Sequence, residues 1–211
     1  MIPTKEEWIK ALEERHGKEL QSKISSSTVA ICGLGGLGSN IAIILSRLGI
    51  GRLILIDFDK VDISNLHRQQ YKPNQIGMEK TNALAQNLEE IAPYLEIETH
   101  TAYMDENNYY ELLQDANIIC EAFDNPEAKA SIVNYVLSEM PEKYIVAASG
   151  MAGIESANMI KTRRVSKRFY LCGDEISDAS DGISLVSSRV MLCAAHQAHM
   201  VLRLIANEFE V

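Results

Sequence analysis

Short apolar runs alternate with longer amphipathic segments along most of the chain. Runs rich in Val, Ile and Leu predict buried strands, while apolar positions that recur about every 3.6 residues predict helices. The predicted strands are 29–32, 52–57, 95–101, 117–123 and 143–149, with weaker candidates at 156–163 and 168–172. The predicted helices are 4–20, 38–48, 81–91, 109–114, 126–140 and 185–207.

This alternation predicts one domain over residues 1–211 with a Rossmann-like α/β fold. The sheet is expected to be mostly parallel, with helices on both faces. An N-terminal helix over about 4–20 and a C-terminal helical stretch over about 185–207 flank the alternating part. The polar segment 174–182, which contains Ser177, Asp178, Ser180, Asp181 and Gly182, suits a mobile loop or crossover.

Charge and the absence of long apolar runs limit the classes of partner. The formal net charge of −9 argues against broad attraction to nucleic acid or anionic lipid, although 161–164 (Lys-Thr-Arg-Arg) is a local basic patch. The first 20 residues contain no secretory apolar core, and no run approaches the roughly 18 apolar residues of a membrane span. We therefore expect a cytoplasmic protein that binds neither membrane nor nucleic acid.

The four cysteines are scattered and form no Cys-x-x-Cys pair, so the sequence suggests neither a disulfide framework nor a zinc knuckle. They are Cys32, Cys120, Cys172 and Cys193. Cys193, His196 and His199 have helix-compatible spacing, but their small and apolar neighbours favour a packed helix over a metal site.

The turn Gly33-x-Gly35-x-x-Gly38 lies between a predicted strand and a predicted helix. Glycines allow a tight turn and close backbone approach, and a helix N-terminus directs free N–H groups toward phosphate. Asp57 ends the next predicted strand, where a carboxylate can hold ribose hydroxyls. The alternative for Asp57 is a structural carboxylate that caps a nearby turn.

Ser64-Asn65-Leu66-His67-Arg68-Gln69 follows and adds a guanidinium and an amide that a hydride-transfer enzyme does not generally need. Arg68 and the Asn65 amide are candidates to clamp the β- and γ-phosphates of a nucleotide. Lys80 is a candidate for a further positive charge. The competing interpretation is that these are solvated surface groups.

Asp124 and Asn125 follow the predicted strand 117–123, so they lie at a carboxyl end, where open α/β sheets bind ligands. Asp124 is a candidate magnesium ligand. The same residues also make a good start for the helix at Pro126, so the competing explanation is that either side chain serves only as a helix cap.

Together, the glycine turn, 56–59 (Ile-Asp-Phe-Asp), 64–69, Lys80 and the Asp124-Asn125 pair resemble the ThiF/MoeB family of ubiquitin-activating-enzyme-like adenylyltransferases. The resemblance covers most of the chain. It implies that Gly36 and Asp57 contact ATP, that Asn65, Arg68 and Gln69 organise its phosphates, that Lys80 neutralises charge and that Asp124 binds Mg²⁺. Gly33, Gly35, Gly38 and Asn125 complete the expected nucleotide site. Arg15 is a further candidate, in its own site or in that of a partner subunit.

The implied reaction joins AMP to the C-terminal carboxylate of a small ubiquitin-like sulfur-carrier protein ending in Gly-Gly, as in thiamine or related sulfur-cofactor biosynthesis. The resemblance also implies a homodimer. Many relatives hold structural zinc with two Cys-x-x-Cys pairs, and because this chain has neither pair we expect no such zinc. Some relatives use a cysteine in sulfur transfer, and Cys172 is the least implausible candidate for it here. A partly buried structural thiol is the favoured interpretation, because no neighbouring His or cationic group in sequence explains thiolate activation.

Three alternatives remain open at this point. An NAD-dependent oxidoreductase accounts for the glycine turn and Asp57, but not for Arg68, Lys80 and Asp124 together. A carrier-binding scaffold without catalysis fits the missing zinc motif and the compact C-terminal region. An adenylase that acts on a small molecule or on RNA is the third.

Overall fold

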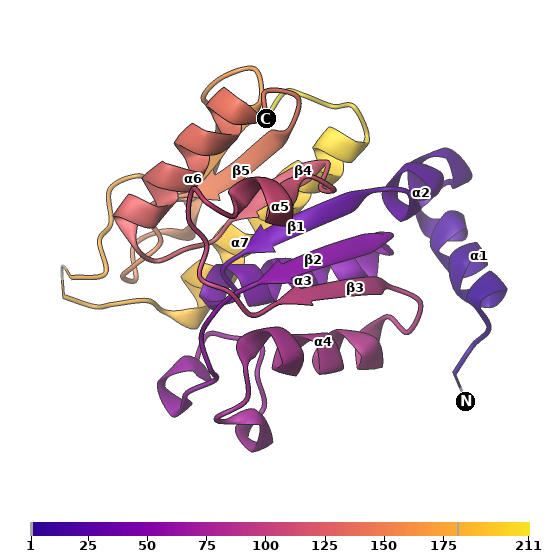
Figure 1. Ribbon diagram of the computed structural model, residues 1–211, viewed down its shortest axis with the longest axis horizontal. Coiled ribbons are helices and arrows are strands. Elements are labelled where there is room, and N and C mark those ends of the chain that lie inside the picture. The colour runs from indigo at the N-terminus through magenta and orange to yellow at the C-terminus, as the bar shows by residue number, and fades with distance from the viewer. Residues whose placement is uncertain (1, 181) are drawn as a thin grey trace.

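The computed structural model describes residues 2–180 and 182–211. One sheet with strand order β3-β2-β1-β4-β5-β7-β6 forms the centre of the molecule, and its helices cover both faces (Figure 1). The strands are β1 (Thr28–Cys32), β2 (Arg52–Ile56), β3 (Glu96–His100), β4 (Ile118–Glu121), β5 (Tyr144–Ala148), β6 (Lys161–Arg164) and β7 (Phe169–Gly173). The helices are α1 (Lys5–His16), α2 (Lys18–Ser25), α3 (Gly36–Leu48), α4 (Lys80–Ile91), α5 (Tyr109–Leu113), α6 (Pro126–Glu139) and α7 (Ser187–Ile205).

The order of the strands creates a switch point in the middle of the sheet. β1 pairs in parallel with β2 on one side and with β4 on the other. After β1 the strand order runs toward one edge of the sheet through β2 and β3, and from β4 onward it runs toward the other edge. The carboxyl end of β1 is therefore the point at which the strand order changes direction. Ligands of open α/β sheets bind in the crevice outside such a point. The fold therefore brings the glycine turn after β1 next to the Asp124 segment after β4.

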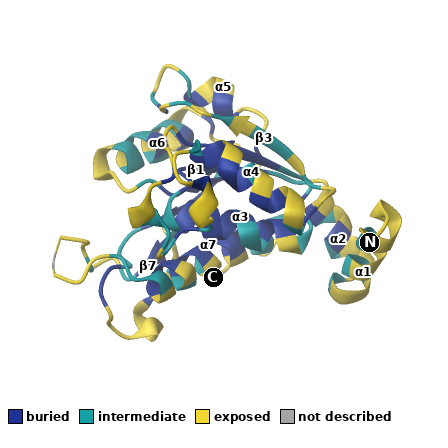
Figure 2. Ribbon diagram, turned by 90° about the horizontal axis from the view of Figure 1, so that it is seen from below, coloured by how far each residue is buried: buried dark blue, intermediate teal, exposed yellow. Residues whose placement is uncertain are grey.

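Alternate residues of the central strands point to opposite faces, which explains their continuous apolar runs. Val29 and Ile31 pack with α3, α4 and α7, whereas Ala30 and Cys32 pack with α5 and α6. Both faces of a parallel sheet are buried, so neither set of residues meets water. In Figure 2 the central strands are buried, and exposed residues concentrate in α1 and the loops. The expected α/β class is confirmed.

Two elements differ from the sequence-based expectation. The leading helix divides at Gly17, which has φ of +81° and separates α1 from α2. A left-handed residue cannot continue a right-handed helix, and glycine adopts that conformation at little cost. The candidate strand at 156–163 is mostly a turn that includes the 3₁₀ segment Ala157–Met159, and β6 pairs antiparallel with β7 at the edge of the sheet.

The helices α1 and α2 lie beyond the amino ends of the strands, on the opposite side of the sheet from the glycine turn (Figure 1). Buried Gln21 fastens α2 to the end of α3 by donating to the Gly49 carbonyl at 3.4 Å. Asp181, one residue of the expected loop 174–182, lies outside the described residues. No helix in the described ranges has both the length and the apolar character needed to cross a bilayer.

A buried ion pair fixes the segment that connects β4 to α6. Lys129 of α6 donates to Glu121 Oε1 at 2.9 Å and to the Phe123 carbonyl at 2.8 Å. The Glu121 side chain is fully buried, and burial raises the pKa of its carboxyl group while Lys129 and backbone N–H groups oppose that rise. The pair thus holds the turn that carries Asp124.

Replacing Lys129 with Met is expected to lower the free energy of unfolding by about 3 kcal/mol, because it leaves Glu121 buried without a counter-charge. Urea unfolding measures the loss. The double variant Glu121→Gln/Lys129→Met should recover part of it, since no buried charge remains.

The matched control is Lys23→Met, because Lys23 pairs with Glu19 on the surface of α2. An exposed pair of this kind contributes at most about 0.5 kcal/mol. Equal losses for Lys23→Met and Lys129→Met would contradict the role given to the buried pair.

Candidate nucleotide-binding site

The glycine turn after β1 is shaped by close backbone contacts. Gly33 has φ of +90°, and a Cβ placed on it would lie 2.8 Å from the Ala122 carbonyl oxygen at the end of β4. A Cβ on Gly38 would lie 1.8 Å from the Gly33 carbonyl oxygen. Gly33 and Gly38 are therefore required for the turn itself.

The first turn of α3 has backbone N–H groups available for an anion. Gly35 is the N-cap of this helix, and no side chain caps it. A Cβ on Gly35 would meet no atom closer than Gln69 Nε2 at 3.7 Å, whereas a Cβ on Gly36 would lie 2.8 Å from Val190 Cγ1 of α7. The uncapped N-terminus of α3 thus lies between the Arg68 segment and the start of α7, and its dipole favours negative charge.

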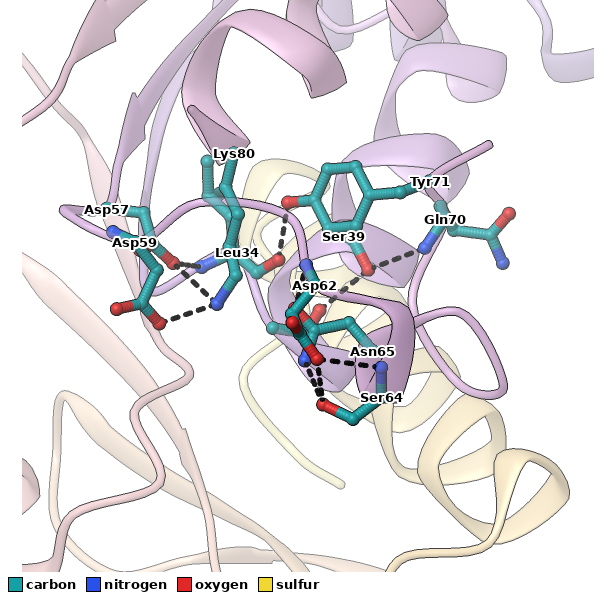
Figure 3. A network of polar contacts seen from close by, with 11 residues as sticks. Leu34, Ser39, Asp57, Asp59, Asp62, Ser64, Asn65, Gln70, Tyr71 and Lys80 are labelled. Atoms are coloured by element: carbon teal, nitrogen blue, oxygen red, sulfur yellow. Dashed lines mark hydrogen bonds and ion pairs between the residues drawn. The ribbon is translucent and has the colours of Figure 1, made fainter. Parts of the chain in front are cut away.

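Asp57 fixes the glycine turn to the end of β2. Its Oδ2 accepts a hydrogen bond from the Leu34 N–H at 2.6 Å, and its Oδ1 accepts one from the Asp59 N–H at 2.7 Å (Figure 3). The Tyr71 hydroxyl donates to the Leu34 carbonyl at 2.7 Å. Asp57 is therefore a structural carboxylate that holds a nearby turn, which was the alternative interpretation of this residue. Each of its carboxylate oxygens still has a lone pair for a ribose hydroxyl.

Lys80 lies between two carboxylates at the start of α4. Its ammonium nitrogen is 2.6 Å from Asp59 Oδ2 and 4.0 Å from Asp57 Oδ2, and its side chain is 7% exposed (Figure 3). Burial raises the pKa of Asp57, and the charge of Lys80 opposes that rise. The lysine is not a solvated surface group, and here its charge balances acidic side chains beside the glycine turn.

Arg68 approaches the N-terminus of α3 from the loop after β2. Its Nη1 donates to the Ser64 carbonyl at 3.0 Å, and its Cδ lies 3.6 Å from the position of a Cβ on Gly36. Its Nε is buried without a hydrogen-bond partner. Burial lowers the pKa of the guanidinium, while the nearby Asp124 carboxylate acts to raise it. Arg68 and Asp124 thus interact electrostatically across the switch point.

The two candidate amides of this loop differ in environment. Gln69 is buried, and its Oε1 has no hydrogen-bond partner. Asn65 Oδ1 accepts a hydrogen bond from the Asp62 N–H at 3.1 Å, and Asp62 in turn caps the 3₁₀ segment Ile63–Asn65. Gln69 lies near Gly35 through its Nε2 and has an unused acceptor, while Asn65 stabilises its own loop.

Asp124 and Asn125 have separate roles in the structure. Asn125 Oδ1 accepts a hydrogen bond from the Ala128 N–H at 2.8 Å and caps α6, as the alternative interpretation anticipated. Asp124 is exposed and belongs to no ion pair within the described part of the chain. Its carboxylate is available for a ligand near Arg68.

Arg15 is the one candidate that lies apart from the others. It is exposed in the last turn of α1, beyond the amino ends of the strands. Gly33, Asp57 and Asp124 all follow carboxyl ends. Arg15 therefore does not join the site of its own chain.

Several residues that support the site were not singled out from the sequence. Asn40 donates to the Gly36 and Arg68 carbonyls at 2.6 and 3.1 Å, which joins α3 to the Arg68 loop. His67 Nε2 lies 3.3 Å from the Leu185 carbonyl oxygen, ahead of α7. A polar residue within the apolar pattern of helix 38–48 is the only signal that could have identified Asn40.

A second buried ion pair joins the loop after β7 to α7. Arg189 pairs with Asp174 and donates to the Glu155 and Ser156 carbonyls at 2.7 and 3.1 Å. Burial raises the pKa of Asp174. The hydrogen bonds from the Ser177 and Ile176 N–H groups and the charge of Arg189 lower it by more, so the pKa is below the ordinary value of 3.8. An arginine near the start of a mostly apolar helical pattern was the available sequence signal.

The cysteines show no sign of thiolate activation. All four are buried and unpaired. Burial raises the pKa of Cys172 to about 12, so its thiol is protonated at neutral pH. Among the described residues, no group of three or more His, Cys, Asp or Glu side chains could hold a metal ion.

A doubly wound α/β domain with an uncapped helix N-terminus, a buried carboxylate and an arginine at one switch point belongs to the nucleotide-binding class of this architecture. The ThiF family model matches residues 10–210, and the chain is a member of the ThiF family.

Curated relatives match over part of the chain. A ubiquitin-like modifier-activating enzyme 5 from Caenorhabditis elegans is 47% identical over 78 residues, which are 37% of this chain and 19% of that protein. The Branchiostoma floridae enzyme of the same name is 36% identical over 58% of this chain and 33% of its own length. An adenylyltransferase and sulfurtransferase MOCS3 from Anopheles gambiae is 36% identical over 52% of this chain and 25% of its own. The aligned parts thus cover about a fifth to a third of these relatives.

Solved structures share the fold at low identity. The Escherichia coli tRNA N6-threonylcarbamoyladenosine dehydratase TcdA, solved in complex with ATP, has a TM-score of 0.86 and 16% identity, over 99% of this chain and 98% of that one. Escherichia coli MccB has a TM-score of 0.74 and 19% identity, over 94% of this chain and 65% of that one.

Gly38→Ala is expected to lower the free energy of unfolding by about 3 kcal/mol, because its methyl group would overlap the Gly33 carbonyl. Gly35→Ala should cost less than about 1 kcal/mol, since its Cβ has space and its φ is not left-handed. Urea unfolding of both variants checks the contrast, and equal losses would contradict the close approach at Gly38.

Asp174→Asn is expected to destabilise the protein by about 3 kcal/mol near neutral pH, because Arg189 would lose its buried counter-charge. The folded-state pKa of Asp174 is lowered, so its contribution is present above the ordinary value of 3.8 and is lost as pH falls through the folded-state pKa. The difference between wild type and variant should therefore shrink below pH 3.8.

Denaturant unfolding at a series of pH values measures this difference. Glu175→Gln is the control, since its partner Arg163 is half exposed and the pair lies on the surface. A difference for Asp174→Asn that stays constant with pH would contradict the account of the ion pair.

Proposed function

We propose that this protein adenylates the C-terminal carboxylate of a small ubiquitin-like sulfur-carrier protein that ends in Gly-Gly, and that it releases pyrophosphate. Thiamine or related sulfur-cofactor biosynthesis is the pathway that we propose. The observation that carries the proposal is the position of the uncapped α3 N-terminus, which lies beside Arg68 and follows β1 at the β1–β4 switch point, next to the segment after β4 that carries Asp124.

ATP fits the polar groups that these residues leave free. No side chain caps the N–H groups of the first turn of α3, and the Nε of Arg68 and the Oε1 of Gln69 have no hydrogen-bond partner. In this proposal Gly33, Gly35, Gly36 and Gly38 border the phosphates, and Asp57 accepts the ribose hydroxyls. Asn65 and Asn125 support the loops on either side.

The proposed reaction is a displacement at the α-phosphorus. A carboxylate oxygen of the acceptor forms a new bond to that phosphorus, the bond to the bridging oxygen of the β-phosphate breaks, and pyrophosphate leaves with the electron pair. No nucleophile from the protein is needed, so the chain acts by orientation and charge stabilisation. Arg68 holds the departing phosphates. Lys80 would contribute its charge by exchanging part of its contact with Asp59.

A divalent cation also fits this donor set. Asp124 is an exposed carboxylate beside the phosphate positions, and Mg²⁺ is usually held by one or two carboxylates together with substrate phosphates. When bound, Mg²⁺ would neutralise phosphate charge. Asp124 would orient it, and Arg68 would limit the repulsion between Asp124 and the nucleotide.

The names of the relatives favour a protein acceptor. The curated relatives at 36–47% identity are named for the activation of a ubiquitin-like modifier or for adenylyltransfer with sulfur transfer. TcdA, which is named for a tRNA modification, shares 16% identity. An RNA acceptor therefore has weaker support, and an NAD-dependent oxidoreductase leaves the interaction between Arg68 and Asp124 without a role.

The remaining parts of the proposal concern assembly. We propose a homodimer in which Arg15 of α1 reaches the nucleotide site of the partner, because Arg15 lies away from the site of its own chain. We also propose a cytoplasmic location. No role in sulfur transfer is proposed for Cys172, since its thiol is buried.

The test is carrier-dependent exchange of labelled pyrophosphate into ATP, measured with several small proteins that end in Gly-Gly. Arg68→Ala and Asp124→Asn are each expected to lower the exchange rate by about a hundredfold or more, since each removes charge stabilisation of the phosphates. Mass spectrometry of the carrier should detect the acyl-adenylate.

Arg47→Ala is the matched control. Arg47 is exposed in the last turn of α3, at the opposite end of the helix from the glycine turn, and exchange should be unchanged. ATP binding without exchange for any carrier would favour the scaffold alternative, and tight binding of NAD in place of ATP would favour the oxidoreductase.

A further inference from the structure

His67 lies beside the nucleotide site and has no role in the function proposed above. Its ring nitrogen Nε2 is 3.3 Å from Nη1 of Arg68 and 3.3 Å from the carbonyl oxygen of Leu185, just ahead of α7. The side chain is exposed, so it does not belong to the core. The ring therefore stands next to the guanidinium that is proposed to hold the phosphates of ATP.

The Nε2 atom of His67 cannot serve both of its neighbours at once. It either carries a proton and donates to the Leu185 carbonyl, or it lacks the proton and accepts from Arg68. The guanidinium of Arg68 stays protonated and can only donate. When Nε2 carries a proton, two N–H donors thus face each other across 3.3 Å. That arrangement is favourable only when an acceptor approaches both of them.

The tip of the Arg68 side chain has one N–H group directed at this acceptor position. Nη1 carries two N–H groups, and one of them donates to the Ser64 carbonyl at 3.0 Å. The other faces Nε2 of His67. An anionic oxygen between Nη1 and Nε2 would accept from both nitrogens, and charge-assisted hydrogen bonds of this kind are stronger than neutral ones.

The backbone beneath these two side chains is fixed by buried contacts. Asn40, which is 3% exposed, donates to the Arg68 carbonyl at 3.1 Å and accepts from Gln70 Nε2 at 2.7 Å. The Arg68 N–H donates to the Asn65 carbonyl at 3.1 Å, which closes a turn. Consecutive side chains of a strand point to opposite faces, whereas this turn brings those of His67 and Arg68 together. The loop thus sets the position of the ring relative to the guanidinium.

The direction of the Arg68 side chain indicates which phosphate lies at its tip. Its Cγ and Cδ are each 3.6 Å from the position of a Cβ on Gly36, in the first turn of α3, while its Nη1 lies beside His67. The side chain therefore runs outward from the N-terminus of α3 to His67. A phosphate chain that begins at the α3 N–H groups and follows Arg68 ends at His67.

We propose that His67 and Arg68 together bind the outermost phosphate of the nucleotide, with one phosphate oxygen between Nε2 and Nη1. In the bound state Nε2 carries a proton and donates to the phosphate instead of to the Leu185 carbonyl. His67 then makes the site selective for a triphosphate, because a monophosphate does not extend to the ring. The proposal rests on the adenylation function above and adds a residue that recognises the pyrophosphate part of ATP.

The competing role for His67 is structural, as a link between the loop after β2 and the segment ahead of α7. A ring that only holds this link acts through the shape of the whole site, so its loss would weaken every nucleotide alike. A ring that binds the outermost phosphate affects only ligands that contain this phosphate. The two roles are therefore distinguished by ligands that differ in their phosphates.

The experiment measures binding of ATP, AMP and inorganic pyrophosphate to the full chain by titration calorimetry with Mg²⁺ present. His67→Leu is expected to weaken the binding of ATP and of pyrophosphate about tenfold, as for the loss of one charge-assisted hydrogen bond, and to leave AMP affinity unchanged. His67→Gln keeps an N–H donor without the charge and should recover part of the loss. Urea unfolding should give wild-type stability for both variants, because the side chain is exposed.

His199→Leu is the matched control, because it makes the same change of side chain at an exposed position in the second half of α7. It should leave the affinities for ATP, AMP and pyrophosphate unchanged. An effect of His199→Leu equal to that of His67→Leu would contradict a specific phosphate contact at His67.

The possible outcomes separate this proposal from the adenylation function. Carrier-dependent exchange in wild type, with ATP and AMP affinities that fall equally or not at all in His67→Leu, would overturn the role of His67 and leave adenylation standing. A selective loss of ATP and pyrophosphate affinity, with no exchange for any carrier, would support the phosphate contact and overturn adenylation. Wild-type protein that binds no ATP would overturn both.

Discussion

The Asp57 carboxylate is the contact on which the geometry of the nucleotide site depends. It accepts hydrogen bonds from the N–H groups of Leu34 and Asp59, so it fastens the glycine turn after β1 to the end of β2. A buried carboxylate is costly unless its acceptors are used, and here two backbone donors and the charge of Lys80 offset that cost. This contact helps to fix the direction in which the α3 N-terminus points, together with the packing of Gly36 against Val190 and the hydrogen bond from Asn40 to the Arg68 carbonyl.

The residues of the site lie on three separate segments, and a different contact holds each segment in place. Asn40 fixes the Arg68 loop to α3, the Glu121–Lys129 pair fixes the turn that carries Asp124, and the Asp174–Arg189 pair fixes the loops in front of α7. All three converge at the carboxyl edge of the sheet. The two buried ion pairs therefore position loops, and removing one partner of either pair leaves a buried charge without its counter-charge.

The sequence predicted the α/β architecture well because central parallel strands are apolar on both faces and their turns are marked by glycine and aspartate. It also singled out Gly33, Asp57 and Asp124, each of which follows a strand that was recognised, and the fold places all three at carboxyl ends of strands, while their roles stay predictions. It did not predict the break at Gly17, because a glycine within a helical pattern is compatible with continuation. Nor did it reveal the partners of Asp57 or Arg189, which include backbone groups and, for Arg189, the Asp174 carboxylate, all brought close only by the fold.

The central claim is that the phosphates of ATP bind at the uncapped N-terminus of α3, between Arg68 and Asp124. The most direct measurement is a crystal structure of the protein with a non-hydrolysable ATP analogue and Mg²⁺. The account predicts phosphates against the N–H groups of 35–38, with the ribose at Asp57 and the metal ion at Asp124. A nucleotide bound elsewhere, with Arg68 and Asp124 both turned away from it, would contradict the account.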